Sequence, residues 1–118
     1  MKEDIVKFSI DGISYGILIC FELRFKELWK QLEGADIILI PARWGKPRKR
    51  HLEILSQALA IMNQTFVIVS NSADDDMASS STIISPWGET YLNDNLECLE
   101  QKLNFKEIRK SRRMINMN

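Results

Sequence analysis

The sequence predicts an α/β fold, in which a sheet with a parallel centre is flanked by helices. Two observations support this prediction. Apolar runs of strand length alternate with segments of helical apolar spacing along the 118 residues, which is the pattern of strand–helix–strand units. Two of the runs, Ile17 to Ile19 and the stretch after Asp36 up to Ile40, are apolar without alternation. Such strands are typically covered on both faces, as in parallel sheets.

An N-terminal hairpin is the first predicted unit. Its strands run from Ile5 to Ile10 and from Ile13 to Cys20, and Asp11-Gly12 forms the tight turn between them. A helix is expected next, from Arg24 to Glu33, with Gly34 ending it. The apolar residues at helical spacing are Phe25, Leu28, Trp29 and Leu32, and Trp29 is expected in the core.

The middle of the chain repeats the order strand, helix, strand. A second buried strand is expected from Asp36 to Ile40, ended by Pro41. A basic loop, GKPRKR at 45–50, precedes a helix from about His51 to Gln64. The apolar stripe of that helix is Leu52, Leu55, Leu59 and Met62. A third buried strand follows from Phe66 to Val69.

The remainder is expected to contain a polar loop, short strands and a basic tail. The loop is SNSADDDMASSS, which is too rich in small and acidic residues to pack in a core. The expected strands are Thr82 to Ser85, Glu89 to Leu92 and Leu96 to Leu103, with a turn at Pro86-Trp87-Gly88 between the first two. A helix is one interpretation of the tail from Phe105.

Composition narrows the function classes. The chain is 45 % hydrophobic and 27 % charged, with a formal net charge of zero, so bulk charge favours neither nucleic acid nor an anionic membrane as a partner. Its apolar runs are far shorter than a bilayer span. Two cysteines make no disulfide framework. The expectation is a cytoplasmic protein with reduced thiols, without a cofactor, a membrane span or nucleic-acid binding.

Cys20 is the residue whose position raises a chemical question. It lies where a buried strand gives way to a helix-prone segment, and catalytic groups often lie at the carboxyl ends of parallel strands. Free N–H groups at a helix start can stabilise a thiolate and an oxyanion. The alternative is that Cys20 is a small buried apolar residue.

Other candidate sites have weaker support. His51, Cys20 and Cys98 fit no zinc spacing, so no metal site is predicted, and His51 is interpreted as starting its helix or lining the cleft. The basic loop at 45–50 is interpreted as a solvated loop, with a phosphate-contacting patch as the alternative. Trp44 and Trp87 either border a pocket or contribute to packing.

The residues around Cys20 resemble a motif of a known protein family. The stretch GILICFELRFKEL resembles the nucleophile motif of the nitrilase superfamily of carbon–nitrogen hydrolases, Cys-Tyr-Asp-Leu-Arg-Phe-Pro-Glu-Leu. Phe21, Glu22 and Lys26 depart from that motif. The residues that match it after the cysteine are Leu23, Arg24, Phe25, Glu27 and Leu28.

Three later blocks resemble the same family in the same order. They are GADIILIPARW, HLEILSQALAIMNQTFVIVSN and SSTIISPWGE. The resemblance implies one half of a four-layer α-β-β-α sandwich and a cysteine nucleophile at Cys20. It also implies a substrate pocket or supporting shell. The residues at those positions are Phe21, Arg24, Glu27, Pro41, Trp44, Asn71 and Ser81.

The chain also departs from the family pattern. The helix block usually carries two arginines and a glutamate where this chain has Gln57, Leu59 and Met62, and the usual aspartate before proline is Ser85. These replacements are expected to alter polar supports around the site. Glu27 is interpreted as a partner of Arg24 at i, i+3.

The family resemblance implies two further catalytic residues, a glutamate base and a lysine, both many tens of residues before the cysteine. Only 19 residues precede Cys20, and none of them lies in a matching motif. Residues 1–118 are therefore expected to form the C-terminal half of a carbon–nitrogen hydrolase domain, and activity is expected to need the missing N-terminal half.

Three functional hypotheses remain open. The first is an amidase-like hydrolase acting through Cys20 on a small amide or nitrile. The second is an inactive remnant or interaction subunit, and the third is a pseudo-enzyme that binds carboxamides. The expected partner is a complementing N-terminal half or a second copy of the chain.

Overall fold

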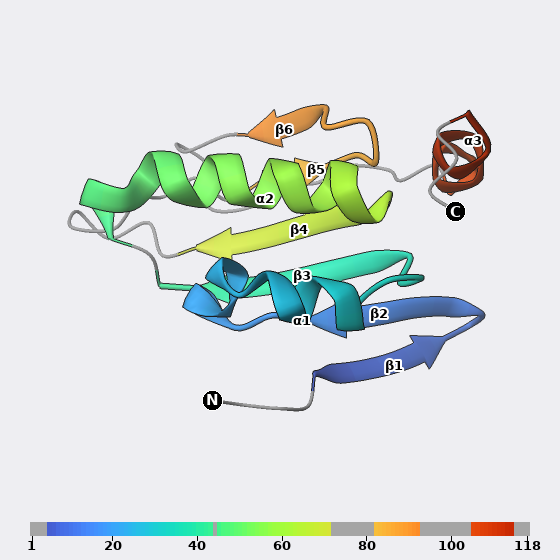
Figure 1. The fold of residues 1–118 in the computed structure, drawn as a ribbon, viewed down its shortest axis with the longest axis horizontal. Coiled ribbons are helices and arrows are strands. Elements are labelled where there is room, and N and C mark those ends of the chain that lie inside the picture. Colours follow the sequence, from blue (N-terminus) through green and yellow to red (C-terminus); the bar gives the residue numbers. More distant parts are fainter. Residues whose placement is uncertain (1–4, 44, 72–81, 93–104, 115–118) are drawn as a thin grey trace.

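The described residues form one mixed sheet with helices. The computed structural model describes residues 5–43, 45–71, 82–92 and 105–114. Within them a six-stranded sheet has the order β1-β2-β3-β4-β5-β6 (Figure 1). The strands are β1 (Val6–Ile10), β2 (Ile13–Ile17), β3 (Ile37–Ala42), β4 (Phe66–Asn71), β5 (Thr82–Ile84) and β6 (Thr90–Leu92). Strands β2, β3 and β4 are parallel and the outer pairs are antiparallel, which confirms the predicted fold class.

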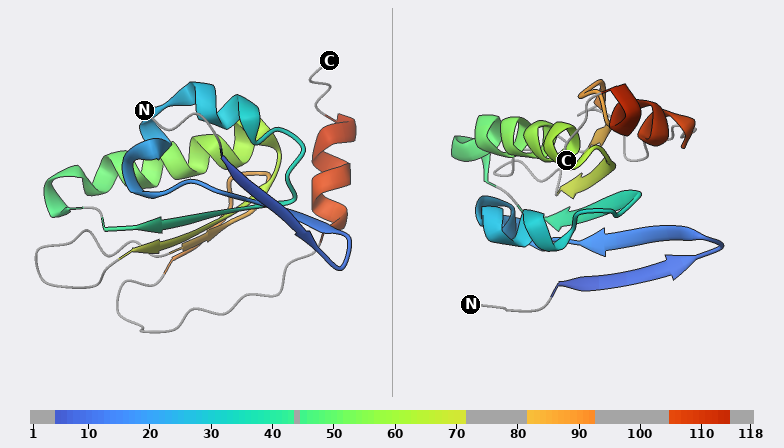
Figure 2. Two further views of the ribbon diagram at one scale, coloured as in Figure 1. Left: turned by 90° about the horizontal axis from the view of Figure 1, so that it is seen from below. Right: turned by 45° about the vertical axis from the view of Figure 1, so that its right-hand side comes forward.

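The helices lie on one face and at one end of the sheet. They are η1 (Cys20–Arg24), α1 (Lys26–Gln31), η2 (Lys46–Arg48), α2 (Lys49–Asn63) and α3 (Lys106–Met114). Figure 2 shows α1 and α2 side by side over the same face, whereas α3 stands at the end of the sheet where β3 and β4 begin. The helical interpretation of the tail is therefore confirmed.

The central strands are apolar on both faces, and each face has its own cluster. Ile38 and Val67 face α1 and α2, where they join a core that includes Leu28, Leu32, Leu52 and Leu59. Ile37 and Phe66 face the other way, and they pack with Ile108 of α3. This two-sided burial is what the continuous apolar runs predicted.

The face opposite α1 and α2 is only partly covered, and we call it the open face. The register pairs Val6 with Ile17 and Phe8 with Tyr15, and it aligns Leu39 with Ile68. Phe8 stacks on Tyr15 with ring centroids 5.0 Å apart, and Val6 and Ile10 of β1 are 46 % and 54 % exposed. The open face is the sheet surface formed by Val6, Phe8, Ile10, Tyr15, Ile17, Leu39 and Ile68. Apolar side chains thus extend across it from β1 to β4.

Hydrogen bonds at the amino edge align β2 with β3. The Ser14 backbone N–H donates to Asp36 Oδ2 at 2.9 Å, and the Ser14 hydroxyl donates to the same oxygen at 3.1 Å. In return the Asp36 backbone N–H donates to the Ser14 carbonyl at 2.9 Å. Ser14 and Asp36 therefore fix one row of the sheet.

The tail helix α3 is attached by contacts to distant parts of the chain. Arg112 Nη2 donates to the Ala35 carbonyl at 3.1 Å, and Gln64 Nε2 donates to the Ser111 carbonyl at 3.1 Å. Trp87 Nε1 donates to Glu107 Oε2 at 2.7 Å. These bonds connect α3 to the start of β3, the end of α2 and the β5–β6 turn.

Several predicted boundaries are wrong. The second strand ends at Ile17 rather than Cys20, because the chain turns into η1. The helix expected from Arg24 to Glu33 is split, since Phe25 has an extended backbone (φ −101°, ψ 97°) between η1 and α1. Strand β3 continues through Pro41, because β2 pairs with β3 only as far as Leu39 and the missing proline N–H interrupts no bond there.

The remaining differences are smaller. The basic segment at 45–50 is a short helix followed by the first turn of α2, not only a loop. In α2, Leu52 and Leu59 are buried as predicted, but Met62 is 57 % exposed. Strand β4 extends through Ser70 and Asn71, which the sequence pattern predicts to lie in the loop. The rest of that loop (72–81) and the strand expected from Leu96 to Leu103 lie outside the described residues.

Gly16 should tolerate no side chain. A Cβ at this position would overlap Leu32 Cδ2, because the end of α1 packs directly on β2 there. Overpacking of this kind destabilises by about 1–3 kcal/mol, so Gly16→Ala is expected to lower the free energy of unfolding by about 2 kcal/mol in urea titrations. Gly45→Ala is the matched control, because its Cβ would meet only Pro47 at 3.7 Å. Equal stability of Gly16→Ala and the wild type would contradict the packing described.

Candidate active site

The parallel register brings three strand ends to one edge of the sheet. Ile17 lies beside Leu39, and Leu39 lies beside Ile68. The last bond between the first two strands is from the Leu18 N–H to the Leu39 carbonyl, at 3.0 Å. Beyond this row the chain reaches Cys20 after β2, while β3 ends at Ala42 beside Asn71 of β4. The carboxyl edge is therefore where Cys20 lies, as the sequence predicted.

Cys20 begins a tight turn that hydrogen bonds hold from both ends. The Ile19 N–H donates to Glu22 Oε1 at 2.8 Å, and the Glu22 N–H donates to the Ile19 carbonyl at 3.0 Å. At the other end Trp29 Nε1 of α1 donates to the Leu23 carbonyl at 2.9 Å. Leu23 is fully buried in the core. The backbone that carries Cys20 is thus anchored to the sheet side and to α1.

A side-chain contact joins this turn to α2. Arg24 Nη2 lies 2.9 Å from His51 Nδ1. Because a guanidinium can only donate, Nδ1 of His51 accepts here and the ring proton is on Nε2. Both residues are exposed. His51 therefore lines this edge, where its side chain contacts Arg24 of η1.

The structure brings some predicted site residues together and separates others. Arg24, Pro41 and Asn71 lie at the carboxyl edge with the backbone of Cys20. Pro41 is exposed, and Asn71 is buried. Glu27 is exposed on the first turn of α1, and the extended Phe25 separates it from Arg24. The predicted Glu27–Arg24 pair at i, i+3 requires one continuous helix. That prediction is wrong, because the chain is extended at Phe25.

The other predicted site residues are described less completely or not at all. Phe21 follows Cys20 within η1. Trp44 and Ser81 lie outside the described residues. Trp44 follows Arg43 in the sequence, and Ser81 precedes Thr82. Thr82 pairs with Val69 of β4, so β5 begins close to the carboxyl edge.

The departures from the family pattern fall into different surroundings. Ser85 lies at the far end of β5, near the amino end of β4, and its Oγ accepts from the Trp87 and Glu89 N–H groups at 3.2 Å each. Gln57 Nε2 donates to the Gly88 carbonyl at 2.8 Å. These two residues support the β5–β6 turn, away from Cys20. The expectation that they alter supports around the site is wrong for them.

Arg43 is a further residue at the carboxyl edge, and it was not among the predicted site residues. This residue is the first after β3, so the register places it at the carboxyl edge, where it is exposed. The sequence carries a signal for this position, because the arginine directly follows a predicted strand and precedes the basic segment and the helix. The basic loop predicted at 45–50 begins two residues after Arg43, so the two belong to one basic segment that follows β3.

The described residues hold neither a metal cluster nor a membrane helix. In residues 5–43, 45–71, 82–92 and 105–114, no group of three or more His, Cys, Asp or Glu side chains is placed to bind a metal ion. None of the helices in these ranges is long and apolar enough to cross a bilayer.

Comparisons with known proteins agree on one family. The carbon-nitrogen hydrolase family matches residues 1–108. The 2-oxoglutaramate amidase of Bacillus subtilis (strain 168) is 39 % identical over 87 residues, which are 69 % of this chain and 34 % of that protein. The "hydrolase in agr operon" of Staphylococcus aureus is 36 % identical over 113 residues, 89 % of this chain and 43 % of that protein.

A solved structure extends the likeness to the fold. Nit3 of Saccharomyces cerevisiae, a member of branch 10 of the nitrilase superfamily, matches with a TM-score of 0.81 at 21 % identity, over 98 % of this chain and 46 % of that one. The chain thus spans less than half the length of these relatives. The family match over most of its residues places this chain in the carbon–nitrogen hydrolase family.

Proposed function

We propose that this chain is the cysteine-bearing part of an amidase-type carbon–nitrogen hydrolase, with Cys20 as the nucleophile. The observation that carries the proposal is the position of residue 20. It is the first residue of a braced turn at the carboxyl edge of parallel strands, where loops form the cleft in α/β folds. The same residue stands at the cysteine of the family motif.

The proposed reaction is hydrolysis of a small amide through a thioester. The thiolate sulfur forms a bond to the carbonyl carbon, and the C=O electron pair moves onto oxygen. Collapse of this intermediate breaks the C–N bond, and the nitrogen leaves as ammonia after accepting a proton. Water then attacks the thioester, releases the carboxylic acid and restores the thiol. A nitrile substrate would enter through a thioimidate instead.

The glutamate base and the lysine that the resemblance implies have no counterpart in the chain. Local replacement has little support, because Glu22 accepts the Ile19 N–H and Glu27 is on the following helix. Catalytic groups must be held to within about half an ångström. We therefore assign the base and the lysine to polypeptide outside residues 1–118.

The open face is the proposed seat of that polypeptide. It is apolar from β1 to β4, with Val6 and Ile10 about half exposed and Ile68 half-buried. Two sheets that pack face to face bury such surfaces about 10 Å apart. In this proposal residues 1–118 form the C-terminal half of a four-layer α-β-β-α domain, and a second sheet completes it. A second copy of the chain is the other candidate for the same face.

The remaining site residues are proposed to line the pocket of the complete domain. Arg24, Pro41 and Asn71 lie at the same edge as the Cys20 backbone, and Phe21 is next to it in η1. Trp44 and Ser81 are adjacent in sequence to residues at this edge. Glu27 is proposed only as a supporting residue, since it lies on α1.

The alternative function is an inactive interaction subunit of the same fold. The specific observation in its favour is the lack of a matching glutamate and lysine among residues 1–118. The alternative keeps the open face as a docking surface but removes the chemistry from Cys20.

Reaction of the thiol separates these functions. If Cys20 is the nucleophile, iodoacetamide should alkylate it at least about tenfold faster than Cys98 in the protein assembled with its complementing half, since an activated thiol has more thiolate at neutral pH. Peptide mass spectrometry after timed quenching gives both rates in one sample. In the protein assembled with its complementing half, an amide substrate should leave an acyl adduct on Cys20, absent in Cys20→Ala. Equal alkylation of the two cysteines in that assembly would end the enzyme proposal.

The open face can be tested by adding a charge to it. Ile68→Glu places a carboxylate in the middle of this face, so it should prevent association with a complementing half, because a buried unpaired charge costs several kcal/mol. Ile54→Glu is the matched control, since Ile54 is 49 % exposed on α2. Size-exclusion chromatography of the co-expressed halves measures association, and circular dichroism checks that both variants fold. Association that survives Ile68→Glu would show that the partner binds elsewhere.

A further inference from the structure

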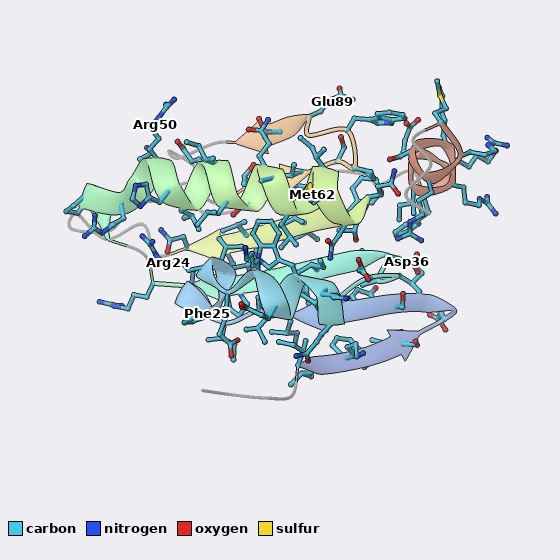
Figure 3. The ribbon with its side chains drawn as sticks, viewed as in Figure 1. Arg24, Phe25, Asp36, Arg50, Met62 and Glu89 are labelled. Carbon is cyan, nitrogen blue, oxygen red and sulfur yellow. The ribbon has the colours of Figure 1, made fainter. Side chains whose placement is uncertain are left out.

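The tail helix α3 has a buried apolar side and an exposed basic side. Ile108 and Ser111 are its buried residues. The exposed basic residues recur every three or four positions, which places them along one side of the helix. They are Lys106, Arg109, Lys110 and Arg113. Figure 3 shows nitrogen-tipped side chains projecting from α3 away from the strands. The whole chain has a formal net charge of zero, so the positive charge of α3 is a local excess.

Basic side chains also line a hollow in the surface at α3. Its volume is about 660 Å³, which lies within the range of small-molecule sites. The described residues that line it are Lys106, Arg109, Arg112 and Arg113. The helix stands at the end of the sheet where β3 and β4 begin, whereas Cys20 follows β2 at the carboxyl edge. The hollow is therefore separate from the candidate active site.

Arg112 is held in place beside the hollow. Its side chain is half-buried, and its Nη2 donates to the Ala35 carbonyl at 3.1 Å. Because this acceptor is neutral, the bond orients the guanidinium without cancelling its charge. A guanidinium has five N–H donors, so the bond to Ala35 leaves others for a ligand.

The nearest described carboxylates do not cancel the charge of α3. Glu107 Oε2 accepts a bond from Trp87 Nε1 at 2.7 Å, and Asp36 Oδ2 accepts one from the Ser14 N–H at 2.9 Å. Both carboxylates are therefore oriented by neutral donors of other elements. Even if both are counted in full, the four basic residues from 109 to 113 leave a positive sum. A local excess of this kind attracts anions.

The basic residues that carry the argument have no acidic partner in the described part of the chain. Arg109, Lys110 and Arg113 form no ion pair there, whereas Lys106 takes part in a further interaction and is not counted. Arg109 and Arg113 are four residues apart, and like charges at this spacing destabilise a helix. The helix dipole favours the cations of the last turn only, so it does not account for Arg109. A bound anion would relieve the repulsion.

We propose that the hollow at α3 binds a small phosphate-bearing anion, with Arg109, Arg112 and Arg113 as its ligands. Arginine suits this task, because its planar fork binds phosphate oxygens through two parallel hydrogen bonds. A phosphate group has enough oxygens to meet several guanidinium groups at once, whereas a carboxylate has two. This inference does not depend on the role of Cys20, because the two sites lie at opposite ends of the sheet.

The size and lining of the hollow favour a small molecule over a nucleic acid. Helix α3 has nine residues, so it is only about 13 Å long. Proteins that bind single strands also offer aromatic side chains on which bases stack. The described residues that line the hollow are all basic. Phe105, just before α3, instead packs edge-on against Phe66, with ring centroids 5.8 Å apart.

Inorganic pyrophosphate is the probe that tests for the site. Isothermal titration calorimetry of the 118-residue chain at constant ionic strength should show saturable binding of about one pyrophosphate per chain. Succinate, a dicarboxylate, should bind at least about tenfold more weakly, because it lacks the oxygens to meet three guanidinium groups. Absence of pyrophosphate binding, or equal binding of succinate, overturns the proposal. The carboxylates of residues 93–104, outside the described part of the chain, are the sequence feature that could produce the first result.

Matched charge removals test whether α3 is the site. Arg109→Gln with Arg113→Gln should raise the Kd for pyrophosphate at least about tenfold, because each change removes a charge-assisted hydrogen bond. The control is Lys26→Gln with Arg50→Gln, which removes two exposed cations elsewhere; Figure 3 shows Arg50 on α2 at the end away from α3. The control should keep the Kd within about twofold of the wild type. An equal loss in both variants would mean that net charge alone drives binding, which contradicts the site.

Two further measurements complete the test. Circular dichroism checks that both double variants keep their helices, as expected for substitutions at exposed positions. A single-stranded oligonucleotide of 12 bases serves as the competing ligand. If it binds at least about tenfold more tightly than pyrophosphate, and loses that affinity in Arg109→Gln with Arg113→Gln, the occupant is a nucleic acid and the small-molecule proposal is wrong. Oligonucleotide binding that both double variants weaken equally is non-specific, and it leaves the pyrophosphate result as the deciding one.

Discussion

The hydrogen bonds between Ser14 and Asp36 set the row on which the rest of the sheet depends. In most sheets the alternation of apolar and polar residues fixes the register, because a slip of one residue exchanges the faces. Here β3 is apolar on both faces, with Ile38 on one side and Leu39 on the other, so alternation cannot decide. The Asp36 carboxylate can meet the Ser14 N–H and hydroxyl in one row only. That row carries through to the carboxyl edge, so Cys20 follows β2 at the same edge of the sheet at which β3 and β4 end.

Much of the fold could be predicted because its signals are local. Apolar runs predicted β3 and β4. Asp11-Gly12 predicted the hairpin turn, and both residues have positive φ. The spacing of Leu52 and Leu59 predicted the buried face of α2. The boundaries at Ile17 and Phe25 could not be predicted in the same way. They depend on the Glu22 carboxylate capping the Ile19 N–H and on Trp29 bonding to Leu23. These are side-chain-to-backbone bonds between residues three and six apart, which helical and strand propensities do not encode. Pro41 shows the same limit, since its place in β3 depends on where the neighbouring strand stops.

Some residues of the candidate site could be predicted from the sequence, and others could not. The position of Cys20 followed from a strand pattern and a motif, so the sequence sufficed. The link between Arg24 and His51 joins residues 27 apart in the chain, and its detection required the packing of η1 on α2. Arg43 follows β3 directly, but its place at the carboxyl edge depends on the register of β2, β3 and β4, which is a property of the folded sheet. Trp44 and Ser81 stay predictions, since both lie outside the described residues.

The attachment of α3 has a consequence for the order in which the chain folds. Its bonds reach back to Ala35, Gln64 and Trp87, across 77, 47 and 20 residues of sequence. Such partners exist only after β3, the end of α2 and the β5–β6 turn have formed, and the loop-closure entropy of distant contacts delays them further. The tail helix is therefore expected to dock last. A growing chain on the ribosome would hold its sheet together before α3 covers the end of β4, so Phe66 would stay exposed until α3 has been made and has docked.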